Sequence, residues 1–97
     1  METINKILSD LKKLMPYLRT TYFVKDIGLF GSYIRNEQDS NSDLDILISF
    51  KEPPSLFKFI ELENFISDKI KIKVDLVMES ALKQNLKKHI LSEVVHL

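Results

Sequence analysis

The sequence predicts an α/β (α+β) domain built around a small mixed sheet, with helices mainly on one face. Apolar residues recur at three- and four-residue spacing near the N-terminus, after residue 55 and near the C-terminus, which is typical of amphipathic helices. Two segments, 43–50 and 70–78, alternate between apolar and other residues, as half-buried strands do. Because helical and strand patterns alternate along the chain, we expect a sheet covered by helices.

Length and composition restrict the classes of protein that need consideration. The chain has 97 residues, which predicts one domain spanning 1–97. Basic and acidic residues number 14 each, and this zero net charge makes nucleic acid an unexpected partner. The absence of cysteine excludes disulfides and thiolate metal sites. No signal-like N-terminus and no apolar run of roughly 20 residues is present, so we expect a cytoplasmic protein that does not bind membranes.

The first half of the chain begins with a helical pattern, which Pro16 is expected to end or kink before a second short helix. Residues 27–30 form a short predicted strand that Gly31 and Ser32 close. Residues 33–36 are expected to form one or two helical turns, and the polar residues 37–42 a loop. The strand predicted at 43–50 then has one apolar face, made by Leu44, Ile46, Ile48 and Phe50.

The second half of the chain resumes after two prolines at 53–54, where Ser55 is a candidate helix N-cap. The buried side of that helix is expected to comprise Leu56, Phe59, Ile60, Phe65 and Ile66. A strand at 70–78 and a final helix from about residue 80 follow, the helix burying Leu82, Leu86, Ile90 and Val94. Both long strands carry aspartate opposite their apolar face, so we expect that side of the sheet to be open to solvent and to hold a cleft.

Three aspartates are candidate metal ligands. Asp43 and Asp45 lie two residues apart on one strand, so their side chains point the same way with Cα atoms roughly 6.5 Å apart. Carboxylate oxygens so placed suit a hard cation such as Mg²⁺. Asp75 is the aspartate within the other long strand, and a third carboxylate would complete a site for two metal ions. Taken alone, the pattern at Asp43 and Asp45 favours strand-start capping and solvation, and Asp75 could be an exposed residue paired with Lys71 or Lys73.

A candidate phosphate site precedes the aspartates. A strand that turns sharply at Gly31 and Ser32 presents backbone N–H groups, and Ser32 adds a hydroxyl donor. Gly31 lets a phosphate approach the backbone without a Cβ in the way. Arg35 is assigned two possible roles with equal weight, which are holding phosphates and pairing with Glu37 or an aspartate. Phosphate donors followed by metal-binding carboxylates together favour a nucleotide site.

The pattern Gly-Ser-x-x-Arg-x-Glu at 31–37 followed by Ser-Asp-Leu-Asp at 42–45 resembles the minimal nucleotidyltransferase (MNT) branch of the DNA polymerase β-type nucleotidyltransferase superfamily. The resemblance covers nearly the whole chain. One departure is Asn36, where the branch commonly has glycine. Because asparagine tolerates left-handed backbone geometry, we expect the turn to be retained.

The resemblance implies a nucleotidyltransferase fold with Asp43, Asp45 and Asp75 as catalytic and metal-binding residues for two Mg²⁺ ions. It implies that Gly31 and Ser32 bind the phosphates of ATP, with Arg35 as a further candidate, and that Asp75 serves the acceptor oxygen. It also implies an antitoxin whose partner is a HEPN-type ribonuclease toxin, with AMP transferred from ATP to a tyrosine of that partner in a hetero-oligomer. Two alternatives stay open, namely a stoichiometric antitoxin with a vestigial site, and a transferase acting on a small molecule or an RNA end.

Overall fold

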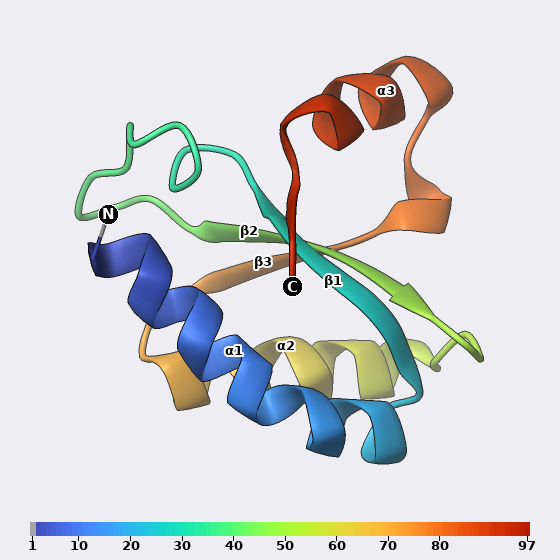
Figure 1. Ribbon diagram of the computed structural model, residues 1–97. Coiled ribbons are helices and arrows are strands. Elements are labelled where there is room, and N and C mark those ends of the chain that lie inside the picture. The colour runs from blue at the N-terminus through green and yellow to red at the C-terminus, as the bar shows by residue number, and fades with distance from the viewer. Residues whose placement is uncertain (1) are drawn as a thin grey trace.

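The protein, described over residues 2–97 by a computed structural model, is a four-stranded mixed sheet with helices on both faces (Figure 1). The elements are α1 (Glu2–Thr21), β1 (Val24–Phe30), β2 (Leu44–Phe50), α2 (Leu56–Ile70), β3 (Val74–Met78), the 3₁₀ turn η1 (Glu79–Ala81), α3 (Gln84–Glu93) and β4 (Val95–His96). The strand order is β3-β2-β1-β4, with β2 and β3 parallel and the other two pairs antiparallel. A parallel pair needs a crossover, which α2 supplies. The predicted mixed α/β fold is confirmed.

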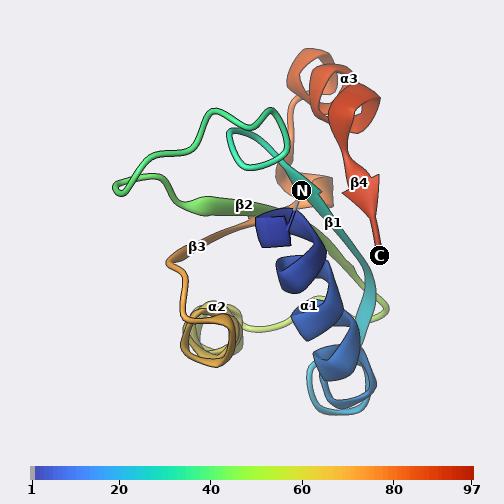
Figure 2. The same ribbon diagram turned by 60° about the vertical axis from the view of Figure 1, so that its left-hand side comes forward.

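The main core lies between the sheet and the pair α1 and α2, which lie on the same side of it (Figure 2). Leu44, Ile46 and Ile48 of β2 are fully buried there, as the alternating pattern predicted. Leu11 and Leu18 of α1 are fully buried against the same face. The apolar faces of strand and helix therefore meet, and this burial is the main source of the fold's stability.

The opposite face of the sheet is not open along its whole length, which corrects the prediction. Helix α3 lies over this face, on the side away from α1 and α2 (Figure 1). Phe30, Leu47 and Ile90 are buried in a second, smaller cluster between the sheet and α3. Leu47 is the apolar residue on the aspartate-bearing face of β2, and α3 shields it from solvent. Two of the three helices are nevertheless on one face.

Helix α1 runs unbroken through Pro16, so the predicted end or kink with a second short helix is wrong. Proline removes one N–H donor and leaves the carbonyl four residues earlier, that of Lys12, without its helical partner. Both Pro16 and Lys12 are exposed, so water can satisfy that carbonyl. Met15 and Leu18, on either side of Pro16, are buried, and their packing holds the helix in place.

Helix α2 begins where the sequence predicted, and it buries the predicted side only in part. Ser55 accepts a hydrogen bond from the Lys58 N–H at 3.2 Å and has the extended backbone of an N-cap. The buried residues are Leu62, Ile66 and Ile70. Among the residues predicted to be buried, Leu56 is 72% exposed and Ile60 is 45% exposed. Ile66 is buried as predicted, and Phe59 and Phe65 are partly buried against the core.

Removing this cap is expected to destabilise the protein measurably. In Ser55→Ala the Lys58 N–H loses its acceptor, which should lower the free energy of unfolding by about 1 kcal/mol. For a domain of this size the melting temperature should then fall by about 4–8 °C. Thermal unfolding followed by circular dichroism measures the change. Ser80→Ala, at an exposed serine that caps no helix, is the control and should change little; equal losses in the two variants would contradict the capping role.

The C-terminal part differs from prediction at three places. Ile70 ends α2 and Lys71 has a left-handed φ of 61°, so β3 begins at Val74 rather than at residue 70. The last helix is α3, which starts at Gln84 after η1, rather than a helix from about residue 80. Of the four residues predicted to be buried, Ile90 is buried and Leu86 is 51% exposed, while Leu82 and Val94 lie just outside α3 and are half-buried. Within the described part of the chain, no helix has the length and apolarity of a membrane span.

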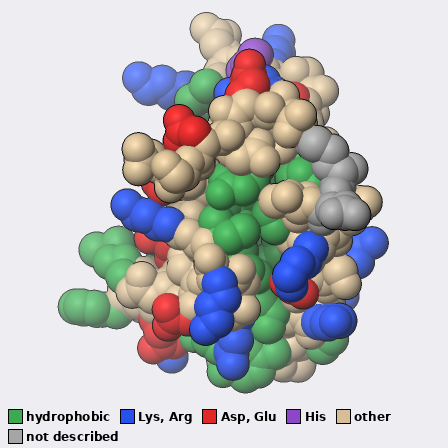
Figure 3. Space-filling view, turned by 90° about the vertical axis from the view of Figure 1, so that its left-hand side faces the viewer, with side chains coloured by type: hydrophobic (Ala, Val, Ile, Leu, Met, Phe, Trp, Pro, Cys, Tyr) green, Lys and Arg blue, Asp and Glu red, His purple; other side chains and the backbone are tan. Residues whose placement is uncertain are grey.

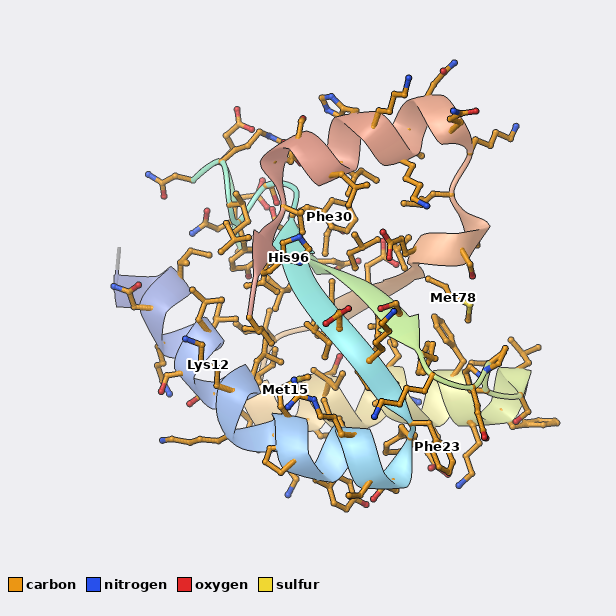
Figure 4. All side chains as sticks on the ribbon, turned by 45° about the vertical axis from the view of Figure 1, so that its right-hand side comes forward. Lys12, Met15, Phe23, Phe30, Met78 and His96 are labelled. Carbon is orange, nitrogen blue, oxygen red and sulfur yellow. The ribbon has the colours of Figure 1, made fainter. Side chains whose placement is uncertain are left out.

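Strand β4 was not predicted. It has two residues, Val95 and His96, and pairs antiparallel with the middle of β1 at Gly28 and Leu29. Figure 4 places His96 beside β1, on the strand that follows α3. A Cβ at Gly28 would lie 2.5 Å from a methyl carbon of Val94, so glycine is what allows the chain to pass so close there.

Candidate active site

The structure brings Asp45 and Asp75 together across two neighbouring strands. In the parallel pairing of β2 with β3, Asp45 is the direct partner of Asp75, so both side chains point to the α3 side of the sheet. Asp43 lies in the loop just before β2, close enough for its charge to act on Asp45. Asp43 and Asp45 are half-buried and Asp75 is exposed. Asp45 and Asp75 therefore share one face of the sheet, and Asp43 lies near them.

Asp45 is the electrostatic centre of this group. The pKa of Asp45 is raised to about 6, mainly by burial, and the negative charges of Asp75 and Asp43 contribute to this shift in the same direction. Arg35 opposes the shift, while Glu93 adds to it. A pKa raised this far means that the positive charge around the carboxylate is too small to offset its burial and the neighbouring negative charges. A bound cation is what would supply that charge.

Gly31 lies directly against the carboxylate of Asp45. The residue before it, Phe30, is the partner of Asp45 in the β1–β2 pairing. Gly31 has a φ of +84°, and a Cβ built there would lie 2.0 Å from Asp45 Oδ2. Both the backbone angle and the close approach require glycine at this position. The Gly-Ser turn and the second carboxylate are therefore parts of one site.

The turn after Gly31 is not a regular helix, which corrects the prediction for residues 33–36. The N–H groups of Ile34 and Arg35 both donate to the Gly31 carbonyl at 3.1 Å, and the Glu37 N–H donates to the Ser32 carbonyl at 2.8 Å. These bonds form consecutive turns instead of a helix. Asn36 has a φ of 59°, so the expectation that asparagine keeps this turn is confirmed.

Arg35 pairs with two glutamates, one predicted and one not. Its Nε donates to Glu37 Oε1, as the sequence allowed. Its Nη1 donates to both carboxylate oxygens of Glu93, at 3.2 and 3.3 Å. Glu93 Oε1 also accepts the Gly31 N–H at 3.1 Å. Glu93 lies 58 residues after Arg35, and no local pattern in the sequence marks it.

A pocket of about 400 Å³ between the sheet and α3 collects most of these groups. Its polar side is bordered by Gly31, Arg35, Asp45, Asp75, His89 and Glu93, and its apolar side by Phe30, Val77, Leu82, Leu86 and Ile90. Figure 4 shows Phe30 near the end of β1, beneath α3. Asp43 borders an adjacent pocket of about 420 Å³ with Tyr33 and Lys73, and the half-buried Ser32 borders neither.

The carboxylates suit Mg²⁺ chemically. A hard divalent cation prefers oxygen ligands, and the carboxylates supply them. The negative charge on Asp45 is disfavoured by its neighbours, and a bound cation would offset it. Between residues 2 and 97 no three acidic or histidine side chains converge tightly enough to enclose an ion as they stand. Binding would therefore require at least side-chain rotation, which is available to the exposed Asp75 and the half-buried Asp43.

Carboxylates on adjacent parallel strands, facing a Gly-Ser turn, define the nucleotidyltransferase class. The sequence matches the nucleotidyltransferase domain family over residues 4–97. It is 48% identical over 96 residues to the protein adenylyltransferase MntA of Thermococcus cleftensis, covering 99% of this chain and 94% of that one. The chain therefore belongs to the nucleotidyltransferase domain family, in the group of MntA-type protein adenylyltransferases.

Solved structures agree with this assignment. A minimal nucleotidyltransferase matches with a TM-score of 0.78 and 28% identity, covering 93% of this chain and 92% of that chain. A toxin–antitoxin complex with AMP-PNP matches with a TM-score of 0.70 and 26% identity, covering 95% of this chain and 69% of that chain. The resemblance to minimal nucleotidyltransferases seen in the sequence is confirmed.

Proposed function

We propose that this chain is a metal-dependent antitoxin that transfers AMP from ATP to a tyrosine of a HEPN-type toxin. The observation that supports this most directly is the pairing of Asp45 with Asp75 beside the Gly31 turn. Membership of the protein adenylyltransferase group supports a protein as the acceptor. The toxin–antitoxin complex with AMP-PNP supports both a toxin partner and an adenine nucleotide as donor.

We assign the three aspartates to binding the metal ion and to activating the acceptor hydroxyl. Asp43 and Asp45 would hold Mg²⁺, and Asp75 would serve the ion and the acceptor oxygen. Gly31, Ser32 and Arg35 would hold the terminal phosphates. Bound Mg²⁺ would polarise the α-phosphate and offset the charge of the leaving pyrophosphate.

The residues themselves orient an in-line displacement. The acceptor hydroxyl oxygen bonds to the α-phosphorus while the bond from that phosphorus to the α–β bridging oxygen breaks. Pyrophosphate leaves with that electron pair, and the hydroxyl proton passes to Asp75 or through it to water. Asp75 is exposed, so an acceptor on another protein can reach it. The Gly31 N–H and Arg35 would keep the leaving group opposite the attacking oxygen.

An aromatic acceptor suits the apolar side of the pocket. Val77 lies two residues after Asp75 on β3, so its side chain is on the same face. Leu86, which is 51% exposed, borders the same pocket from α3. A phenol ring lying against Val77 and Leu86 would bring its hydroxyl toward Asp75. This arrangement supports tyrosine over a small aliphatic hydroxyl.

An RNA end is a weaker candidate for the acceptor. The net charge of the chain is zero. On the face shown in Figure 3, basic and acidic side chains are interspersed, and hydrophobic side chains are visible between them. Nucleic-acid binding depends on a concentration of positive charge, which this face does not offer.

A stoichiometric antitoxin is the second candidate function. It is favoured by the engagement of Arg35 and the Gly31 N–H with Glu93, since these are the groups assigned to the phosphates. If the site were vestigial, the chain would neutralise its toxin by covering it, and the aspartates would be dispensable.

The two functions are distinguished by incubating the chain with its HEPN partner, ATP and Mg²⁺ and then measuring the mass of the partner by mass spectrometry. The transferase predicts a mass increase equal to AMP on the partner, located on tyrosine by peptide fragmentation. Chelation of Mg²⁺ with EDTA is expected to abolish the increase, because the carboxylates alone cannot offset the phosphate charge.

The control is Asp43→Ala/Asp45→Ala, compared for both modification and neutralisation. Loss of the AMP adduct together with loss of neutralisation supports the transferase. Full neutralisation without any adduct, in the wild type as in the variant, would replace it with the stoichiometric antitoxin. GTP, CTP and UTP tested in parallel show which base the site accepts.

A further inference from the structure

The Glu93 carboxylate occupies the groups that the proposed function assigns to nucleotide phosphate. One oxygen accepts the Gly31 N–H at 3.1 Å, and both oxygens accept from Arg35 Nη1. A guanidinium nitrogen and a backbone N–H that converge on one anionic group are donors that proteins also use to bind phosphate. Glu93 therefore acts as an internal anion at this position.

The surroundings of Glu93 otherwise disfavour a negative charge. It is the last residue of α3, and the C-terminal end of a helix carries partial negative charge. The charge of Glu93 also acts unfavourably on Asp45, whose pKa it helps to raise. The carboxylate is thus held by Arg35 and Gly31 against repulsion from the helix end and from Asp45.

The Glu93 side chain is also free to rotate away from Arg35 and Gly31 toward solvent. Its side chain is 19% exposed and borders the pocket that contains Asp45 and Asp75. A phosphate that enters this pocket meets the carboxylate directly. Arg35 would stay in place when Glu93 leaves, because Glu37 holds its Nε from another direction.

We propose that the Gly31 N–H and Arg35 form one oxyanion position, held by Glu93 in the free protein and taken by a phosphate oxygen of the nucleotide. This inference rests on the proposed function and adds a residue that sets nucleotide affinity. The need to displace Glu93 lowers the apparent affinity for the nucleotide, because only the molecules in which Glu93 has released Arg35 and Gly31 are competent to bind it.

The test is the affinity of the Glu93→Gln variant for tripolyphosphate and for a non-hydrolysable ATP analogue, measured by titration calorimetry with and without Mg²⁺. Glutamine keeps the size of the side chain but removes its charge, so it competes less well. The dissociation constants are expected to fall by about three- to tenfold. Affinity for adenosine, which has no phosphate, should not change.

Glu37→Gln is the matched control. It removes a charge from the same arginine, but the amide oxygen of glutamine can still accept from Arg35 Nε and keep the guanidinium in place. The Gly31 N–H also stays bonded to Glu93, so the affinity should change by less than about twofold. Should Glu93→Gln fail to fold, Glu93→Asp carries the test. It keeps the charge, but it is one methylene too short to keep both contacts, and it should also tighten binding.

Three results would overturn the inference. Unchanged or weaker phosphate binding in the folded Glu93 variants would show that Glu93 supports the site instead of competing for it. An equal gain in Glu37→Gln would assign the effect to net charge. If neither the wild type nor any variant binds the ATP analogue with Mg²⁺, the proposed function fails as well. If the wild type and all variants bind it equally well, only this inference fails.

Discussion

Replacing Asp45 with asparagine is expected to stabilise the protein while abolishing AMP transfer. The folded protein pushes the pKa of Asp45 to about 6, so ionising this carboxyl at neutral pH costs free energy. Removing the charge should raise the free energy of unfolding by about 1–2 kcal/mol at pH 7.5, allowing for solvent screening at a half-buried site. Transfer should fall by about 10³-fold or more, because a metal ligand supplies several kcal/mol of transition-state stabilisation.

The pH dependence gives this prediction a definite sign. The folded pKa lies above the ordinary value, so the destabilisation is fully present above about pH 6 and is lost as the pH falls toward 4. The stability difference between Asp45→Asn and the wild type should therefore shrink over that range. Urea unfolding at pH 7.5, 6 and 4.5, without divalent ions, measures it.

Asp68→Asn provides the control, because it removes one charge from an exposed position on α2. It should change stability by less than about 0.5 kcal/mol and leave transfer intact. An Asp45→Asn variant that is less stable than the wild type at pH 7.5 would show that the carboxylate is well paired in the folded protein. Retained transfer by that variant would remove Asp45 from the proposed metal site.

Gly31→Ala is expected to impair the site without removing any functional group. A Cβ would lie 2.0 Å from Asp45 Oδ2 and 2.9 Å from its Cγ, so the carboxylate must rotate away. The φ of +84° adds backbone strain, for a total loss of about 1–3 kcal/mol in stability. A displacement of about 1 Å at a reacting group can cost roughly 10² in rate, and we expect transfer to fall by about that factor. Thermal unfolding and the AMP-adduct assay measure the two effects.

Asn36→Ala separates backbone strain from displacement of the carboxylate. Asn36 also has positive φ, at 59°, and lies in the same turn, but it is exposed. Alanine there should cost about 1 kcal/mol in stability and leave transfer within a few-fold of wild type. Comparable losses of transfer in both variants would mean that the shape of the turn, and not contact with Asp45, decides activity.

The residues of the candidate site could be predicted largely because they depend on local patterns. Strict alternation predicted Asp43 and Asp45 on one strand face; in the structure Asp45 lies in β2 as the partner of Asp75, and Asp43 lies just before the strand. Alternation also placed Asp75 on the corresponding face of β3, although the strand itself is shorter than predicted. Their roles as metal ligands stay predictions.

The helices show where local patterns fail. Leu56 and Ile60 have helical spacing, yet they are exposed, because the side of α2 that meets the core is the one with Phe59, Leu62 and Ile66. Leu86 is half-exposed for a similar reason, since α3 buries Ile90 and leaves space over the carboxylates. Spacing indicates which residues share a face, but the position of the helix against its neighbours decides how much of that face is covered.

By itself, the sequence determined the helix–strand order of most of the chain, the apolar face of the sheet, the cap at Ser55 and the shared face of the aspartates. These features follow from the two-residue and 3.6-residue periods of the backbone, which are local properties. Only the tertiary structure decided that α3 covers part of the aspartate face, that β4 pairs with β1, and that Glu93 reaches Arg35 and Gly31. These contacts join segments about 60 residues apart, and the free energy of packing the whole chain selects them.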